Sequence, residues 1–268
     1  MQQVKAKKYL GQHFLTDLDV ARRISEALPV GVCRKVIEIG PGMGVLTRFL
    51  LERDDLNLTA VEIDTESVVY LHRHYPRLDV READFLKVNI DDIVPDGEPF
   101  MVVGNYPYNI SSQIFFRVLD YRDRIPVCAG MIQKEVAERI AAPAGSKTYG
   151  ITSVLLQAFY DIEYLFTVHE NVFSPPPKVK SAVIRMTRNG RRHLECDERL
   201  FFTVVKTAFN QRRKTMRNSL RPLMQGRAML YDVFDKRPEQ LSVVEFIELT
   251  NLVSHILSQP PSEQQSLG

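Results

Sequence analysis

The stretch Val36-Ile37-Glu38-Ile39-Gly40-Pro41-Gly42-Met43-Gly44 decides the fold of this 268-residue chain. Its first four residues predict a short buried strand, and its glycines lead into residues 45–51, where apolar side chains have helical spacing. Strand, glycine turn and helix form a nucleotide-binding arrangement, because glycines let backbone amides approach a ligand near a helix N-terminus. The glycines at 40, 42 and 44 depart from the G-x-G-x-x-G order of dinucleotide-binding proteins. We therefore expect Gly40 and Gly42 to contact a ligand without a pyrophosphate, such as S-adenosylmethionine, rather than NAD.

Acidic residues follow the next two predicted strands. The strand over residues 58–64 ends in acids about 20 residues past the glycines, the position from which a carboxylate binds a ribose diol. We expect Glu62 to do so, because it stands directly after the apolar part of the strand, while Asp64 is better placed to cap the helix that follows. Asp84 follows a short strand over residues 79–81 and is placed to accept a hydrogen bond from an adenine amine. The alternatives are a helix cap for Glu62 and an ordinary surface acid for Asp84.

The apolar run over residues 100–104 predicts a buried strand, and Asn105-Tyr106-Pro107-Tyr108 comes directly after it. An Asn amide can accept a hydrogen bond from an exocyclic amine, and Pro fixes a turn while its carbonyl stays available. Tyr offers a flat face on which a base can stack. Because ligands bind at the carboxyl ends of strands in open α/β sheets, these residues predict a pocket for an amino-bearing heterocycle. The alternative is a simple strand-to-loop turn with a core tyrosine.

Length and composition are those of an ordinary globular protein, with room for a mid-sized domain and a small one. The sequence has no apolar run long enough to span a bilayer and no signal-peptide pattern, so we expect a cytoplasmic protein without a membrane partner. Cys33, Cys128 and Cys196 lie far apart in the sequence, which predicts reduced core thiols rather than a disulfide framework or a metal site.

Positive charge is concentrated in one segment. Residues 188–227 contain eleven Lys or Arg and three acids, although the whole chain has a net charge of only +2. This asymmetry favours a polyanionic partner, with a solvated basic helix as the alternative. Arg213, Arg217 and Arg221 have the spacing of one helix face, which would form a phosphate-binding stripe. Because only helical patterns follow residues 188–192, we predict domains over 1–189 and 190–268.

Several further segments, taken in order along the chain, are similar to those of the ribosomal RNA adenine dimethyltransferase family, and most similar to its bacterial small-subunit branch. They are Leu10–Leu15 (LGQHFL), Gln133–Arg139 (QKEVAER), Gly145–Gly150 (GSKTYG), Phe173–Val179 (FSPPPKV) and Phe209–Leu220 (FNQRRKTMRNSL). The sequence departs from the family where His13 replaces the more usual Asn, and where Tyr106 replaces Leu or Ile.

The resemblance implies a Rossmann-like methyltransferase domain followed by a small all-helical C-terminal domain that binds RNA. It implies contacts to S-adenosylmethionine, without a metal, from His13, Leu15, Gly40, Glu62, Asp84 and Asn105. It also implies contacts to the target base from Asn105, Pro107, Tyr108 and Phe173.

The activity implied by the resemblance is N6,N6-dimethylation of two adjacent adenosines in the 3'-terminal hairpin loop of small-subunit (16S) rRNA, by a monomer that also serves small-subunit biogenesis. Three alternatives stay open. A large-subunit rRNA methyltransferase of the macrolide-resistance type shares the fold, but the segment over residues 212–218 favours the small-subunit branch. A DNA adenine methyltransferase typically has Asp where Asn105 stands. A factor that mainly checks ribosome assembly would need binding more than catalysis.

Overall fold

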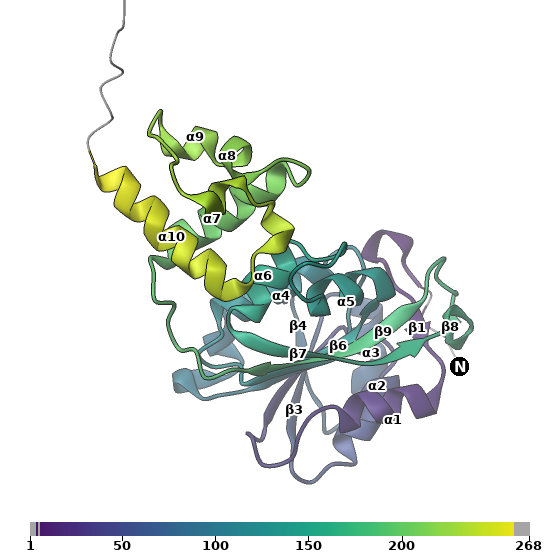
Figure 1. Ribbon diagram of the computed structural model, residues 1–268. Helices are drawn as coiled ribbons and strands as arrows, with labels where there is room; N and C mark the ends of the chain where they lie inside the picture. The colour runs from purple at the N-terminus through teal and green to yellow at the C-terminus, as the bar shows by residue number, and fades with distance from the viewer. Residues whose placement is uncertain (1–3, 5, 260–268) are drawn as a thin grey trace, which may run out of the picture. The chain divides into compact units, whose positions relative to one another are not determined.

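Within the part of the chain that the structure describes, residue 4 and residues 6–259 of a computed structural model, seven strands form one mixed sheet (Figure 1). Their order across the sheet is β4-β3-β2-β5-β6-β9-β7. The strands are β2 (Lys35–Ile39), β3 (Asn57–Glu62), β4 (Asp79–Glu82), β5 (Met101–Asn105), β6 (Val127–Gln133), β7 (Tyr160–Val168) and β9 (Ser181–Arg188).

The strand directions create a crevice at the middle of the sheet. β2 is parallel to both of its neighbours, β3 and β5, and the chain moves outward through β3 and β4 before it returns to β5. The carboxyl ends of β2 and β5 therefore lie at the point where the strand order reverses, which is where open α/β sheets bind ligands. The glycine turn follows β2 and Asn105 ends β5, so both predicted motifs lie at this crevice.

The far side of the sheet contains its one reversed strand. β9 is antiparallel to both β6 and β7. β6 was not predicted. It is buried from Val127 to Ile132, so its sequence is a continuous apolar run without the alternation that marks a half-exposed strand.

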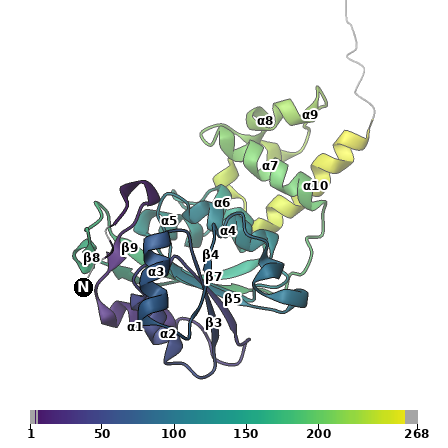
Figure 2. The ribbon, with the colours of Figure 1, turned by 180° about the vertical axis from the view of Figure 1, so that it is seen from behind.

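Helices α1 (Leu18–Glu26), α2 (Val45–Leu51) and α3 (Thr65–His74) cover one face of the sheet, and α4 (Ser111–Asp120) covers the other (Figures 1 and 2). Asp17 caps α1, because its side chain accepts hydrogen bonds from two backbone N–H groups of the first turn. In the short 3₁₀ segments Ile90–Asp92 and Pro95–Gly97 the chain returns toward β5.

An N-terminal arm precedes α1. It contains a 3₁₀ turn, Lys8–Leu10, and a two-residue strand, β1 (Phe14–Leu15). β1 pairs antiparallel with β8 (Phe173–Ser174), which follows the 3₁₀ turn Glu170–Val172. This pairing holds two segments about 160 residues apart beside each other, next to the carboxyl ends of the central strands.

The chain divides into two compact units. The first runs to Glu138 and includes Tyr160–Asn189, while the second consists of Arg139–Phe159 and the chain from Gly190 onward. The predicted division at 189/190 assigned residues 139–159 to the first domain, whereas in the structure they belong to the second unit. The end of the predicted second domain, beyond Gln259, lies outside the described residues.

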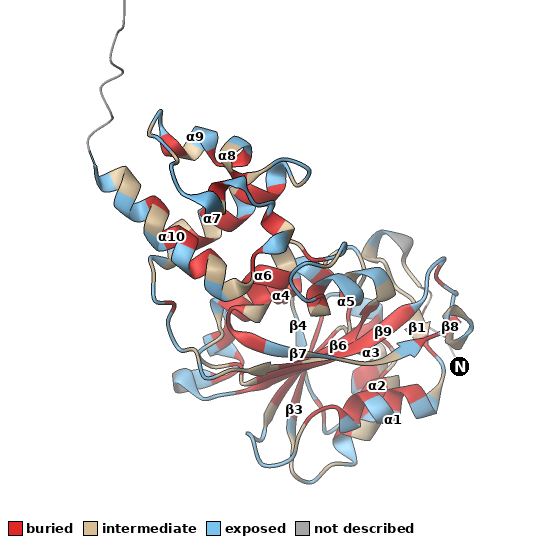
Figure 3. Cartoon of the chain, viewed as in Figure 1, coloured by how far each residue is buried: buried red, intermediate tan, exposed pale blue. Residues whose placement is uncertain are grey.

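The second unit is built from helices. They are the end of α5 (Lys134–Ala141), α6 (Ile151–Gln157), α7 (Glu198–Asn210), α8 (Met216–Ser219), α9 (Arg221–Met224) and α10 (Val243–Ser258), with 3₁₀ turns Asp232–Asp235 and Pro238–Gln240. Buried stripes on α7 and α10 are visible in Figure 3, and the rings of Phe209 and Phe246 stack at 5.8 Å. α10 begins with a capping box, in which Ser242 and Glu245 exchange side-chain and backbone hydrogen bonds.

Candidate active site

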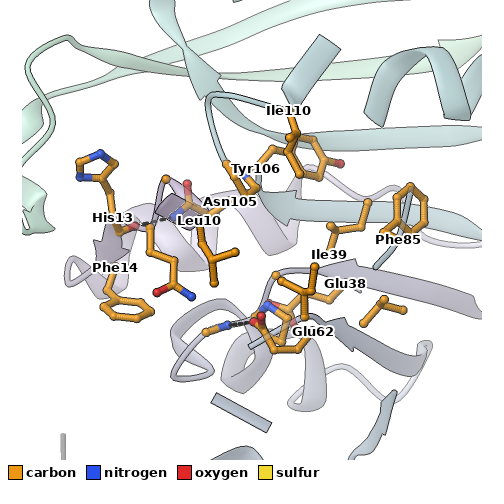
Figure 4. Close-up of a pocket in the computed structure, with 18 of the residues that line it drawn as sticks. Leu10, His13, Phe14, Glu38, Ile39, Glu62, Phe85, Asn105, Tyr106 and Ile110 are labelled. Atoms are coloured by element: carbon orange, nitrogen blue, oxygen red, sulfur yellow. Dashed lines mark hydrogen bonds between the residues drawn. The ribbon is translucent and has the colours of Figure 1, made fainter. Parts of the chain in front are cut away.

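A cavity opens at the carboxyl ends of β2, β3 and β5 and is bordered by the loop after β4 and by the N-terminal arm (Figure 4). Nine of the predicted site residues line it: His13, Leu15, Gly40, Gly42, Glu62, Asp84, Asn105, Pro107 and Tyr108. Side chains from residue 13 to residue 108 thus meet in one place, which the separate sequence motifs did not establish by themselves.

The glycine turn after β2 forms the floor of this cavity. Gly40 and Gly42 have φ angles of 64° and 56°, a left-handed backbone that favours glycine. A Cβ atom at Gly42 would lie 2.8 Å from the Phe14 ring, whereas one at Gly40 would meet nothing within 4 Å. The missing side chain at Gly40 therefore leaves space that a ligand can fill, and the missing side chain at Gly42 lets the arm pack against the turn.

Glu62 links the turn to the end of β3. Its carboxylate accepts a hydrogen bond from the Gly42 N–H at 3.0 Å (Figure 4) and another from the Asp64 N–H at 2.9 Å. Burial raises the pKa of Glu62, although these two N–H groups oppose the shift. Glu62 is thus a fixed acceptor at the position predicted for ribose binding.

Asp64 has a different task. It occupies the N-cap position of α3 and accepts a hydrogen bond from the Ser67 hydroxyl. Its carboxylate also forms an ion pair with Lys7, whose ammonium lies 3.2 Å from Glu66 as well. The acid therefore ties the N-terminal arm to the sheet, a contact that the sequence did not predict.

Glu38 is a cavity residue that sequence reasoning missed. It lies inside β2, is 1% exposed, and accepts a 2.7 Å hydrogen bond from the Thr47 hydroxyl. Burial raises its pKa to about 8, the Thr47 hydroxyl opposes the shift, and the charge of Glu62 adds to it. A signal was available, since an acid within the otherwise apolar Val-Ile-Glu-Ile strand needs a partner or a ligand.

Asp84 lies at the side of the cavity formed by the loop after β4. One of its oxygens accepts a hydrogen bond from the Leu86 N–H at 2.9 Å, and the other lies 3.4 Å from the Lys87 ammonium. Phe85, which is buried, also lines the cavity. An acceptor beside an apolar wall suits the edge and face of an adenine ring.

The Asn105 side chain is fixed by the arm. Its Nδ2 donates a 3.1 Å hydrogen bond to the His13 carbonyl, so its Oδ1 is the group available to accept a hydrogen bond (Figure 4). The Pro107 carbonyl accepts the Ile110 N–H at 3.2 Å, which uses one of its two lone pairs. The corner thus offers two acceptors separated by one residue.

Tyr108 and His13 form the aromatic part of the site. Their ring centroids are 5.6 Å apart with an interplanar angle of 27°. The Tyr108 hydroxyl hydrogen-bonds with the Ser181 hydroxyl, and His13 Nδ1 lies 2.8 Å from the Pro175 carbonyl oxygen. Both rings are held by partners outside the cavity.

Phe173, which the resemblance led us to expect at the target base, does not line the cavity. Its side chain is 4% exposed and packs in the hydrophobic core, and its backbone lies opposite Leu15 in the β1–β8 pair. The structure therefore brings His13, rather than Phe173, against Tyr108.

The predicted stripe of Arg213, Arg217 and Arg221 on one helix is wrong. Helix α7 ends at Asn210, Arg213 lies in the turn that follows, and the other two arginines belong to the separate helices α8 and α9. Arg217 makes a bidentate contact with Asp235 at 2.7 and 2.8 Å and also donates to the Met229 carbonyl. Arg213 and Arg221 are exposed.

The described part of the chain contains neither a metal-binding cluster nor a membrane-spanning helix. No group of three or more His, Cys, Asp or Glu side chains there could hold a metal ion. Among the same residues, no helix is both long enough and apolar enough to cross a bilayer.

The sheet order, the glycine turn and the acids at the ends of the central strands define a Rossmann-like methyltransferase that uses S-adenosylmethionine. The family model for ribosomal RNA adenine dimethylases matches residues 3–254, and the chain belongs to that family. A "Ribosomal RNA small subunit methyltransferase A" of Parabacteroides distasonis is 60% identical over 270 residues, covering 99% of this chain and 98% of the relative.

Two solved structures are similar in fold. A dimethyladenosine transferase from Plasmodium falciparum has a TM-score of 0.75 and 22% identity, covering 91% of this chain and 98% of that chain. The 23S rRNA methyltransferase ErmE has a TM-score of 0.66 and 28% identity, covering 89% of this chain and 99% of that chain.

Proposed function

We propose that this protein transfers methyl groups from S-adenosylmethionine to the N6 atoms of two adjacent adenosines in the 3'-terminal hairpin loop of small-subunit (16S) rRNA, twice each. The observation that carries the proposal is the Asn105 corner. Its amide is oriented by the His13 carbonyl, and it borders the same cavity as the glycine turn. The high identity to a relative named as a small-subunit methyltransferase supports this choice of RNA.

The residues around the cavity suit each part of the cofactor. Glu62 is placed to accept hydrogen bonds from ribose hydroxyls, Asp84 to accept one from the adenine amine, and the space beside Gly40 to admit the ligand next to the backbone. Glu62 puts a carboxyl group near a ligand that carries positive charge. When bound, S-adenosylmethionine supplies an electrophilic methyl group on a sulfonium sulfur.

The corner after β5 acts on the target base. The lone pair of an adenine N6 is delocalised into the ring, which makes the amine a poor nucleophile. Hydrogen-bond acceptors on both of its N–H groups, Asn105 Oδ1 and the Pro107 carbonyl, favour a more tetrahedral nitrogen whose lone pair can attack. Orientation of two reactants can lower a barrier by roughly 7 to 11 kcal/mol. No general base is required, since the nitrogen becomes acidic once it is methylated and cationic.

The Tyr108 ring positions the base. An adenosine must leave its stack to reach the cavity, which costs a few kcal/mol and is cheapest in a hairpin loop. Stacking on an aromatic side chain returns roughly 1 to 3 kcal/mol per base. Because His13 already stacks on one face of Tyr108, the base takes the other face or displaces the imidazole.

RNA binding is the proposed task of exposed cations in the helical unit, of which Arg213 and Arg221 are two. We propose that Arg217 contributes less to RNA binding, because its guanidinium already forms an ion pair with Asp235. The protein acts as a monomer in the cytoplasm, where its substrate is assembled, and light scattering of the purified chain tests the monomer.

The deciding experiment offers methyl-labelled cofactor and the protein to undermethylated small subunits, large subunits and duplex DNA in parallel. We expect N6,N6-dimethyladenosine only in small-subunit RNA, mapped by mass spectrometry to two neighbouring residues. An Asn105→Ala variant should lose about 100-fold in rate, the order of loss seen when one preorganised hydrogen-bonding group is removed from an active site. Methylation of large subunits or DNA would contradict the proposal. Full assembly activity with the Asn105→Ala variant would instead favour a binding factor.

A further inference from the structure

Tyr106, the residue between the two proposed acceptors, lines the cavity but has a buried ring. Its side chain is 1% exposed, although the corner to which it belongs borders the cavity. The ring of Phe115, on α4, meets it edge-on with centroids 5.9 Å apart. A fully buried ring cannot stack on an RNA base, so any contribution to the reaction has to pass through Asn105 and Pro107.

The Tyr106 ring fills space that two glycines leave empty. Gly104 and Gly130 lie opposite each other in the β5–β6 pair. A Cβ atom at Gly104 would lie 2.8 Å from Tyr106 Cε1, and one at Gly130 would lie 2.6 Å from Cε2. Both would also meet backbone oxygens at 2.6 and 2.5 Å. The ring therefore lies directly on the backbone of two adjacent strands.

Tyr106 is also fastened to β6 at two points. Its backbone N–H donates a 3.0 Å hydrogen bond to the Met131 carbonyl, and its hydroxyl donates a 2.8 Å hydrogen bond to the Ala129 carbonyl. The Cys128 sulfur lies 3.4 Å from the same hydroxyl. Burial raises the pKa of this hydroxyl, so it stays protonated and remains a donor. A Leu side chain at this position has no hydroxyl and would lack the second attachment.

We infer that Tyr106 is a positioning residue, which sets the separation and direction of the Asn105 side-chain carbonyl and the Pro107 backbone carbonyl by anchoring the corner to β6. The inference rests on the proposed function, because it assigns those two carbonyls to the N6 amine. It concerns the rate of methyl transfer and not the binding of cofactor or RNA, since the ring is buried and leaves no surface for either to contact.

The test compares Tyr106 with a matched tyrosine of the same sheet. Tyr160 is also 1% exposed, and its hydroxyl donates to the Ile125 carbonyl at 2.9 Å, but it does not border the cavity. Replacing either residue by Leu or Phe removes the same groups from the core. We expect Tyr106→Leu to lower kcat more than Tyr106→Phe does, because it removes the ring from the two strands as well as the hydroxyl. Tyr106→Phe should lower kcat about threefold to tenfold, through loss of one buried hydrogen bond.

Tyr160→Leu and Tyr160→Phe should keep kcat near the wild-type value. The Kd for S-adenosylhomocysteine and the KM for small subunits should stay within about twofold in all four variants, which separates positioning from binding. Equal losses of kcat in the Tyr106 and Tyr160 variants, or full activity of Tyr106→Phe, would overturn the inference. If Tyr106→Leu does not fold, the two Phe variants decide.

A second readout does not depend on activity. The side-chain amide of Asn105 should show a single sharp pair of ¹H–¹⁵N resonances in the wild type and in the Tyr160→Phe variant. The same resonances should broaden or shift in Tyr106→Phe. If the wild type methylates no small subunit, the proposed function fails, whereas unchanged Asn105 resonances in Tyr106→Phe would refute the anchoring itself.

Discussion

Glu38 is the residue whose environment is most unusual for its chemistry, because it places a carboxyl group inside an apolar strand at the floor of the cavity. Burial raises its pKa from 4.5 to about 8, so between these values it is ionised in the unfolded chain and protonated in the folded protein. The folded state binds the extra proton, and the free energy of unfolding therefore falls as pH rises through this window. The contribution is up to about 1.4 kcal/mol per pH unit.

Urea unfolding at pH 5.5, 7 and 8 measures this contribution. Glu38→Gln, which keeps an acceptor for Thr47, should be less sensitive to pH across the window than the wild type and should gain stability relative to it at pH 8. Glu163 supplies the control, because the Arg185 guanidinium lowers its pKa and it titrates below the window. Glu163→Gln should leave the slope unchanged. A wild-type slope in Glu38→Gln would show that Glu38 is ionised in the folded protein.

At the scale of elements, the break after α7 changes which arginines are available to RNA. Arg213 and Arg221 are exposed, so each should release about one counterion when it meets a phosphate. Arg213→Ala and Arg221→Ala should each flatten the plot of log K against log salt by about one unit for binding to small subunits. Arg217→Ala should change that slope less and instead lower the melting temperature, since Asp235 loses its partner. Filter binding between 50 and 300 mM KCl checks all three, and the largest slope change in Arg217→Ala would contradict this account.

The strands and turns that build the cavity could be predicted because their signals are local. Each signal determines structure within a few residues of itself. This holds for the apolar runs, for the glycine spacing and for the acid at the end of β3. The arginine stripe failed because spacing alone assumes that a helix continues, whereas Arg217 is bound to Asp235, eighteen positions away. The expected contact of Phe173 with the base was not found for the same reason, because the position of Phe173 depends on its backbone pairing with Leu15, which is far away in the sequence. Contacts of long sequence separation leave no local pattern.

At the scale of the whole molecule, ligand binding and the helical unit are separate in sequence. All residues that line the cavity lie between Tyr9 and Ile110, in the first unit. A ligand at 100 times its Kd stabilises the state that binds it by about 2.7 kcal/mol. We expect this gain to raise the free energy of unfolding of the unit that forms the site. Hydrogen exchange of the full chain with S-adenosylhomocysteine should therefore slow at the turn after β2, at the end of β3 and at the Asn105 corner.

Helices α7 and α10 should keep their exchange rates in the same experiment, because they contribute no residue to the cavity. Glu62→Gln supplies the control for site binding, since the amide replaces one acceptor by a donor and should weaken both affinity and protection. Equal protection of α10 and of the cavity residues would show that the two units unfold as one. In that case the cofactor would also stabilise the helices proposed to bind RNA, so cofactor and small subunit would bind cooperatively and each would raise the affinity for the other by the same factor.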